Sequence, residues 1–183
     1  MIVIDPNVTI SELENGRILN VKKYKNVVTT RGINFLIQRA LRMPLVDDYT
    51  NHIISLFRVG NGGSLNPEHE EDIDLSRPLQ FLDYTQNITR CDGNTYYDVR
   101  PKLTYTNTKS WKVSVIITPN HLISGTIFDE IGLYACSQGE DGHYSNAMLF
   151  SRLVIGAPMQ VTDTKLAQIT WDFGITYVRG DGK

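Results

Sequence analysis

The sequence has little cysteine, and its cysteines form no recognisable cross-link or metal site. Cys91 and Cys136 are the only two, and they stand far apart with no cysteine or histidine at ligand spacing. A disulfide framework needs more cysteines and a secretory context. We therefore expect two free thiols, acting as small packed residues, in a protein that folds in a reducing cytosol.

Long apolar runs and an excess of one charge are also lacking. No stretch approaches the ~20 apolar residues of a transmembrane helix, and residues 1–6 do not resemble the start of a signal peptide. The net charge is −2, from 18 Lys and Arg against 20 Asp and Glu. Nucleic-acid-binding proteins typically carry a basic excess, so we do not expect a nucleic acid as partner. Because there is no long apolar run, we do not expect a membrane as partner either.

No motif in the sequence marks a catalytic centre. A Gly-x-Ser-x-Gly nucleophile motif is absent, and the four histidines stand outside any zinc-binding pattern. Paired carboxylates that meet only in the folded chain would leave no trace in the sequence. A small cell-wall or capsule hydrolase therefore stays open as an alternative, without positive support. The expectation is a protein that is not an enzyme and that holds no cofactor and no metal.

A glycine-rich segment, Gly60-Asn61-Gly62-Gly63, comes nearest to a phosphate loop. It follows an apolar segment, but no Gly-Lys-Ser/Thr comes after it. The five carboxylates between residues 68 and 74 would repel phosphate; they could hold Ca²⁺ weakly, but they lack EF-hand spacing. A solvated acidic loop is the favoured interpretation. We predict that the glycines supply a positive φ at a sharp turn.

What the sequence does have is enough apolar residue to build a core. Hydrophobic residues make up 41% of 183, which suits one domain of ordinary size. Near the N-terminus, Asn15-Gly16 separates two weakly alternating segments, Thr9–Leu13 and Ile18–Tyr24, which predicts a β-hairpin. We interpret residues 1–25 as an exposed arm that becomes ordered when it docks on a partner.

One segment has the periodicity of a helix. Apolar residues recur with helical spacing over about residues 30–42, with Thr29 or Thr30 placed to cap the start and Pro44 to stop the helix. The residues predicted to share its apolar face are Ile33, Leu36, Ile37, Ala40 and Leu41.

The remaining segments read as β-strands. Ile53–Val59, Trp111–Thr118, Ile127–Ala135, Met148–Ile155 and Leu166–Val178 are the clearest, and Phe81–Arg90 with Thr95–Tyr105 should form a hairpin. In the last strand Ile169, Trp171 and Phe173 share one face. Many strands and one helix predict a mainly β fold. We expect an antiparallel β-sandwich over residues 26–183, with one packed helix.

Two charged residues stand inside strong strands. Glu130 lies in Ile127–Ala135, and Arg152 lies in Met148–Ile155. If these strands pair, the two side chains can form a hydrogen-bonded ion pair that fixes the register, because a lone buried charge is costly. The alternative is that both face water.

Short motifs follow one another in a set order along residues 26–178. They are Val28, Thr29 and Gly32; Val59 to Gly63 with Pro67; Asp72 to Leu75; Phe128 to Tyr134; Leu149 to Arg152; and Ile169 to Phe173. Their order resembles that of a group of tailed-bacteriophage virion structural proteins, which includes fibre-attachment-like β domains of the tail, collar, neck and baseplate. These positions carry the resemblance. The landmark residues among them are Gly32, Gly60, Gly62, Gly63, Glu130, Gly132, Leu133, Tyr134, Arg152 and Trp171. The chain departs from the pattern by an extra glycine in the turn and by Gly156-Ala157-Pro158, where an aromatic residue is expected before the proline.

The resemblance implies a structural role in a virion and implies no catalytic residues. The expected partners are further copies of the chain, in a ring or around the tail or neck, and neighbouring virion proteins, with an adaptor for fibres as one form of this role. The alternative function is a module that binds carbohydrate or a host receptor. Aromatic residues that could stack on sugars lie in the middle of the chain, at Tyr84, Tyr96, Tyr97, Tyr105 and Trp111.

Overall fold

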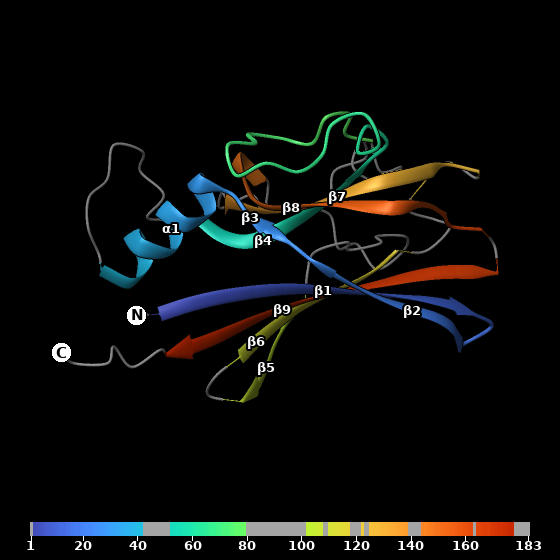
Figure 1. Cartoon of the computed structure of the whole chain (residues 1–183), viewed down its shortest axis with the longest axis horizontal. Coiled ribbons are helices and arrows are strands. Elements are labelled where there is room, and N and C mark those ends of the chain that lie inside the picture. The colour runs from blue at the N-terminus through green and yellow to red at the C-terminus, as the bar shows by residue number, and fades with distance from the viewer. Residues whose placement is uncertain are drawn as a thin grey trace.

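Two antiparallel β-sheets lie face to face in the computed structural model of the chain, and a helix stands at one end of them (Figure 1). The structure describes residues 2–41, 52–79, 102–107, 110–117, 122, 125–138, 144–162 and 164–177. The predicted class, a mainly β antiparallel sandwich with one packed helix, is confirmed for this part of the chain.

In the described part of the chain, nine strands make up the two sheets. The five-stranded sheet has the order β2 (Arg17–Lys25), β1 (Ile2–Glu14), β9 (Lys165–Tyr177), β6 (Ser110–Ile117) and β5 (Lys102–Asn107). The four-stranded sheet has the order β3 (Val27–Val28), β8 (Tyr144–Gln160), β7 (Ile127–Gln138) and β4 (His52–Gly60). The helix α1 spans Thr30–Leu41 and packs against β8.

The main core lies between the sheets and follows the alternation that the sequence predicts. On β9, Ile169, Trp171 and Phe173 are fully buried, while Thr170 and Asp172 on the opposite face are half-buried. The Trp171 ring meets the Phe57 ring of β4 edge-on, with 5.6 Å between centroids. Aromatic pairs in this geometry add stabilisation beyond their buried area. This contact therefore joins the central strand of the five-stranded sheet to the β4 edge of the four-stranded sheet.

The predicted N-terminal hairpin is present, but it is not a detached arm. Asn15 and Gly16 have positive φ values of 50° and 76°, as a two-residue type I′ turn requires. However, β1 lies between β2 and β9 and pairs with β9 along its whole length. Val8 and Ile10 of β1 are buried in the core, with 0% and 2% exposure. The division at residue 25 was therefore wrong, because an alternating strand with an apolar face is stable only where that face is covered.

The helix is present where the sequence predicts it, but it turns a different face to the core. Phe35 is buried beside Phe150. Of the predicted apolar stripe, Leu36 packs against the core, whereas Ile33 and Ile37 are 45% and 42% exposed. The cause is Gly32, where a Cβ would lie 2.2 Å from the Phe150 carbonyl oxygen. Because only glycine allows this approach, the helix must rotate its Gly32 side towards β8.

Thr29 caps this helix, as the sequence predicts. Its hydroxyl oxygen accepts a hydrogen bond from the Gly32 N–H at 3.0 Å and donates one to the Leu149 carbonyl at 2.7 Å. A capping side chain satisfies one of the backbone N–H groups that the first turn leaves without a partner. The same residue therefore begins the helix and attaches it to β8.

Several predictions for the middle of the chain fall outside the described residues. These include the strand Phe81–Arg90, most of Thr95–Tyr105, Pro44 and the thiol of Cys91. The described remainder, Lys102–Asn107, forms β5 and pairs with β6. On β6, the predicted alternation is confirmed, because Val113, Val115 and Ile117 are buried.

The position of β1 in the sheet predicts that it contributes to stability without any partner protein. Val8→Ala should lower the free energy of unfolding by about 2 kcal/mol, because it removes fully buried methyl groups. Val21→Ala, at an exposed position on β2, should change it by less than ~0.5 kcal/mol. Urea denaturation of the isolated protein measures both. Equal small effects at the two positions would show instead that the hairpin is a detachable arm.

Candidate functional site

The two charged residues singled out in the sequence form a buried ion pair. Arg152 Nη2 and Nε donate to Glu130 Oε2 at 2.7 and 3.1 Å. The side chains are 0% exposed for Glu130 and 1% for Arg152. In the register of β7 and β8, Arg152 lies opposite Gly132, two residues along from Glu130. The paired reading is therefore confirmed, and the reading in which both face water is wrong.

The pair lies beneath a long loop that covers the outer face of the four-stranded sheet (Figure 1, green). We call residues 61–77 the clamp loop. Its two ends meet, because the Asn61 N–H donates to the Arg77 carbonyl at 3.0 Å and Gly60 bridges to Pro78. The loop thus leaves β4 and returns to the same place.

Glu130 holds the two ends of the clamp loop together. Its Oε1 accepts hydrogen bonds from the backbone N–H groups of Gly62, at 3.1 Å, and Arg77, at 2.8 Å. Its Oε2 accepts a third backbone bond, from Ser76, at 3.0 Å. Charge-assisted hydrogen bonds of this kind are roughly twice as strong as neutral ones. One carboxylate therefore fixes both the beginning and the end of the loop.

Arg152 holds the middle of the clamp loop from below. Its Nη2 donates to the Asn66 carbonyl at 2.9 Å and to Ser76 Oγ at 2.8 Å, and its Nη1 donates to Asp72 Oδ2 at 2.7 Å. All three guanidinium nitrogens are thus used within the chain. Burial on its own would lower the pKa of Arg152, but the hydrogen bonds and charges of Asp72 and Glu130 outweigh it and raise this pKa. The guanidinium is held as a cation around which the loop folds.

Asp129, the neighbour of Glu130, binds the same loop. Its carboxylate accepts from the backbone N–H groups of Gly63, at 2.8 Å, and Ser64, at 2.9 Å. Neighbouring side chains of a regular strand point to opposite faces. The register of β7 against β8 shifts between Phe128 and Glu130, however, and such an irregularity redirects a side chain. Burial raises the pKa of Asp129, but the hydrogen bonds from Ser64 and Gly63 more than offset it, so the pKa is lowered.

The glycines of the segment 60–63 serve close packing and not a positive φ. Among the described residues, φ is positive only at Asn15, Gly16 and Gly125, so the predicted reason for these glycines was wrong. A Cβ on Gly60 would lie 2.4 Å from Glu130 Oε1, and one on Gly63 would lie 2.6 Å from the Asp129 carbonyl oxygen. Side chains at these positions would push the loop away from its two carboxylates.

A second, smaller apolar core lies under the other part of the clamp loop. Leu75 from the loop packs there with Tyr134 of β7, and the remaining members are Leu56, Cys136 and Leu149. Gly132 makes room for this core, since a Cβ would lie 2.8 Å from the Tyr134 ring. The Tyr134 hydroxyl donates to Asp74 Oδ1; burial, and then this bond, raise the pKa of Tyr134 well above its usual range.

The acidic stretch is thus only partly solvated. Asp72 pairs with Arg152, Asp74 accepts from Tyr134, and Glu68 accepts from the Val154 N–H at 3.3 Å. Glu70 and Glu71 are exposed, and the Glu71 carboxylate also accepts from the Thr30 hydroxyl at the start of the helix, at 2.9 Å. Among the described residues, no group of three or more His, Cys, Asp or Glu side chains lies close enough to hold a metal ion.

The structure thus brings most of the landmark residues to one place. Gly60, Gly62, Gly63, Glu130, Gly132, Tyr134 and Arg152 all contact the clamp loop or the side chains beneath it. Leu133 and Trp171 lie in the main core between the sheets, and Gly32 lies at the helix. Sequence reasoning missed Asp129 and Ser76, which have no distinguishing pattern apart from their neighbours.

No protein-family model, no curated protein and no solved structure matches this chain. Among the residues that the structure describes, no helix is long and apolar enough to cross a membrane.

A double-mutant cycle tests whether Glu130 and Arg152 act as a unit. Arg152→Met should lower the free energy of unfolding by about 3–5 kcal/mol, because it leaves the Glu130 carboxylate buried without its cation. Adding Glu130→Gln should cost much less than it does alone, since residues in one network are coupled. Arg77→Met, at an exposed arginine of the same loop, is the matched control and should cost under ~0.5 kcal/mol. If the effects of Arg152→Met and Glu130→Gln on the free energy of unfolding were additive, the two residues would not act as a unit.

The lowered pKa of Asp129 predicts a specific dependence on acid. Because its folded pKa lies below the unfolded value of ~3.9, the stabilisation is fully present above that value and is lost as pH falls through the folded pKa. Asp129→Asn should therefore cost about 1–3 kcal/mol at neutral pH, and this difference should shrink below pH ~4. Urea denaturation over a pH series measures it; a difference unchanged in strong acid would contradict the prediction.

Proposed function

We propose that the protein is a non-enzymatic structural component of a tailed-phage virion, which assembles with further copies of itself and with neighbouring tail, neck, collar or baseplate proteins. The observation that carries the proposal is the clamp loop. Motifs on which the resemblance depends lie far apart in the sequence, yet they meet at this one loop. The glycine turn and Asp72–Leu75 belong to the loop, and Phe128–Tyr134 and Leu149–Arg152 lie beneath it. These motifs therefore form one structural unit, which supports the resemblance.

The use of the buried charges also supports a structural role. An active site typically holds ionisable groups that are poised to react with a substrate. Here the carboxylates of Asp129 and Glu130 accept hydrogen bonds from the backbone of the clamp loop, and Arg152 donates to the loop and to Glu130. These groups fix the conformation of the clamp loop, which is a structural role of the kind expected in an assembly protein.

Exposed apolar side chains support binding to other proteins. Large apolar side chains are exposed on β2 and on the clamp loop, among them Leu19 at 53%, Leu65 at 63% and Ile73 at 64%. Exposed apolar groups rimmed by charge commonly mark protein interfaces. The alternative, a carbohydrate- or receptor-binding module, depends on five aromatic residues. Tyr84, Tyr96 and Tyr97 lie outside the described residues, and Tyr105 and Trp111 stand opposite each other on β5 and β6.

Light scattering tests the proposal. The mass of the purified protein is measured alone and after mixing with tail or neck assemblies from particles that lack it. A closed oligomer, or a monomer that joins those assemblies in fixed stoichiometry, is the expected result. A monomer that joins nothing would contradict the proposal, and binding to a glycan array by that monomer would favour the alternative.

A further inference from the structure

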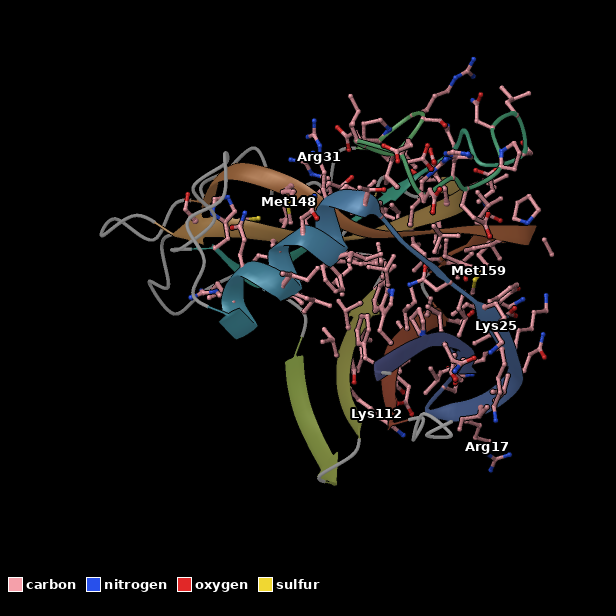
Figure 2. All side chains as sticks on the ribbon, turned by 60° about the vertical axis from the view of Figure 1, so that its left-hand side comes forward. Arg17, Lys25, Arg31, Lys112, Met148 and Met159 are labelled. Carbon is pink, nitrogen blue, oxygen red and sulfur yellow. The ribbon has the colours of Figure 1, made fainter. Side chains whose placement is uncertain are left out.

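Among the described residues, β2 forms one edge of the five-stranded sheet, and this strand is basic and partly apolar. It pairs with β1 on one side and ends the sheet on the other. Its sequence, Arg17–Lys25, contains four cations and no acid. Arg17 lies opposite Glu14, but Lys22 and Lys23 lie opposite uncharged residues of β1. Figure 2 shows the two ends of this strand, Arg17 and Lys25, at the edge of the molecule.

The same strand exposes three apolar side chains next to these cations: Ile18, Leu19 and Val21, at 62%, 53% and 49%. An edge strand that is long and apolar is a site for pairing with another chain unless charge prevents it. Lysines disfavour pairing with an edge of like charge, which argues against a second β2 as the occupant. They favour an occupant that carries acids beside apolar residues.

The clamp loop of the same molecule has that composition. Leu65 and Ile73 are 63% and 64% exposed, and the exposed acids Glu70 and Glu71 lie between them in the sequence. The loop covers the outer face of the four-stranded sheet, whereas β2 is the edge of the five-stranded sheet (Figure 1). The two surfaces therefore lie apart on one molecule and cannot meet without a second copy.

We infer that the clamp loop of one copy docks on the β2 edge of the next, with Glu70 and Glu71 against the lysines and Leu65 and Ile73 against Ile18, Leu19 and Val21. Such a contact joins two different surfaces. Repeated head to tail, it closes into a ring or extends into a filament. The inference rests on the proposed function, because it names the partner in assembly as the chain itself.

Docking between copies would also give the hydrogen bonds that hold the clamp loop a second role. A loop docks with less loss of entropy when it is already held in its bound shape. Glu130 and Arg152 fix the backbone on both sides of Ile73, through Asp72 and Ser76. The buried ion pair would thus pre-organise the surface that the next copy meets.

Two variants disrupt one surface each. Val21→Glu with Lys23→Glu changes β2, and Glu70→Lys with Ile73→Lys changes the clamp loop. Each should raise the dissociation constant for self-association by about a hundredfold or more, because like charges then face each other. Ile116→Glu is the matched control for Val21→Glu. Both positions are 49% exposed, and both lie on the five-stranded sheet in the row that joins Val21, Ser11, Gln168 and Ile116.

Mixing the two variants decides the geometry. Each should be monomeric alone in analytical ultracentrifugation, but the pair should form a dimer and nothing larger. The intact β2 of one variant meets the intact loop of the other, and no further copy can add. A loop variant that still self-associates like the wild type would overturn the inference in favour of β2–β2 pairing. Unchanged association in both variants, or a wild-type protein that never self-associates, would also overturn it. Circular dichroism on heating checks that each variant folds.

The proposed function and this inference can fail separately. If the wild-type protein stays monomeric but joins tail or neck assemblies, the virion role stands and the docking of copies on each other falls. If copies associate through these two surfaces but join no assembly, the docking stands and the virion role falls.

Discussion

The structure depends on the buried positive charge of Arg152, which must be surrounded by hydrogen-bond acceptors. A guanidinium buried at the outer face of a sheet is stable only if acceptors surround it, because the loss of its hydration costs several kcal/mol. Arg152 obtains these acceptors from Glu130 and from a loop that begins at the end of β4. The loop in turn has little regular structure of its own and needs buried partners for its backbone. The loop supplies acceptors for Arg152, and the buried charges supply partners for the loop backbone, so neither is stable without the other.

This dependence explains why β7 is buried on both faces. A strand of an antiparallel sheet usually alternates between apolar and polar residues because one face meets water. Residues 128–136 of β7 are all buried, since the main core lies under one face and the clamp loop covers the other. The sequence of this strand, with Asp129 and Glu130 between apolar residues, reflects two different environments and not a single amphipathic strand.

Alternation and turn residues were enough to predict the strands β4, β6, β7, β8 and β9 and the turn at Asn15-Gly16. They could not place β1, because residues with weak alternation look alike at an edge and at the centre of a sheet. The helical period placed α1 correctly but not its rotation, which a single backbone contact at Gly32 decides. At the site, the Glu130–Arg152 pair was open to prediction from charges in strong strands. The contributions of Asp129, Asp72 and Ser76 were not, because a loop without periodicity gives no sign of what its backbone will bind.

The pairing of β1 with β9 has a consequence for synthesis. Ile2 pairs with Tyr177 and Glu14 with Lys165, so the central contact of the five-stranded sheet joins segments from opposite ends of the described chain. Contacts between such distant segments slow folding, because a long loop must close before any of them forms. During synthesis, β1 leaves the ribosome before β9, so the apolar face of β1 stays uncovered until β9 has been made. An apolar strand that has no partner during this interval makes the nascent chain prone to aggregation.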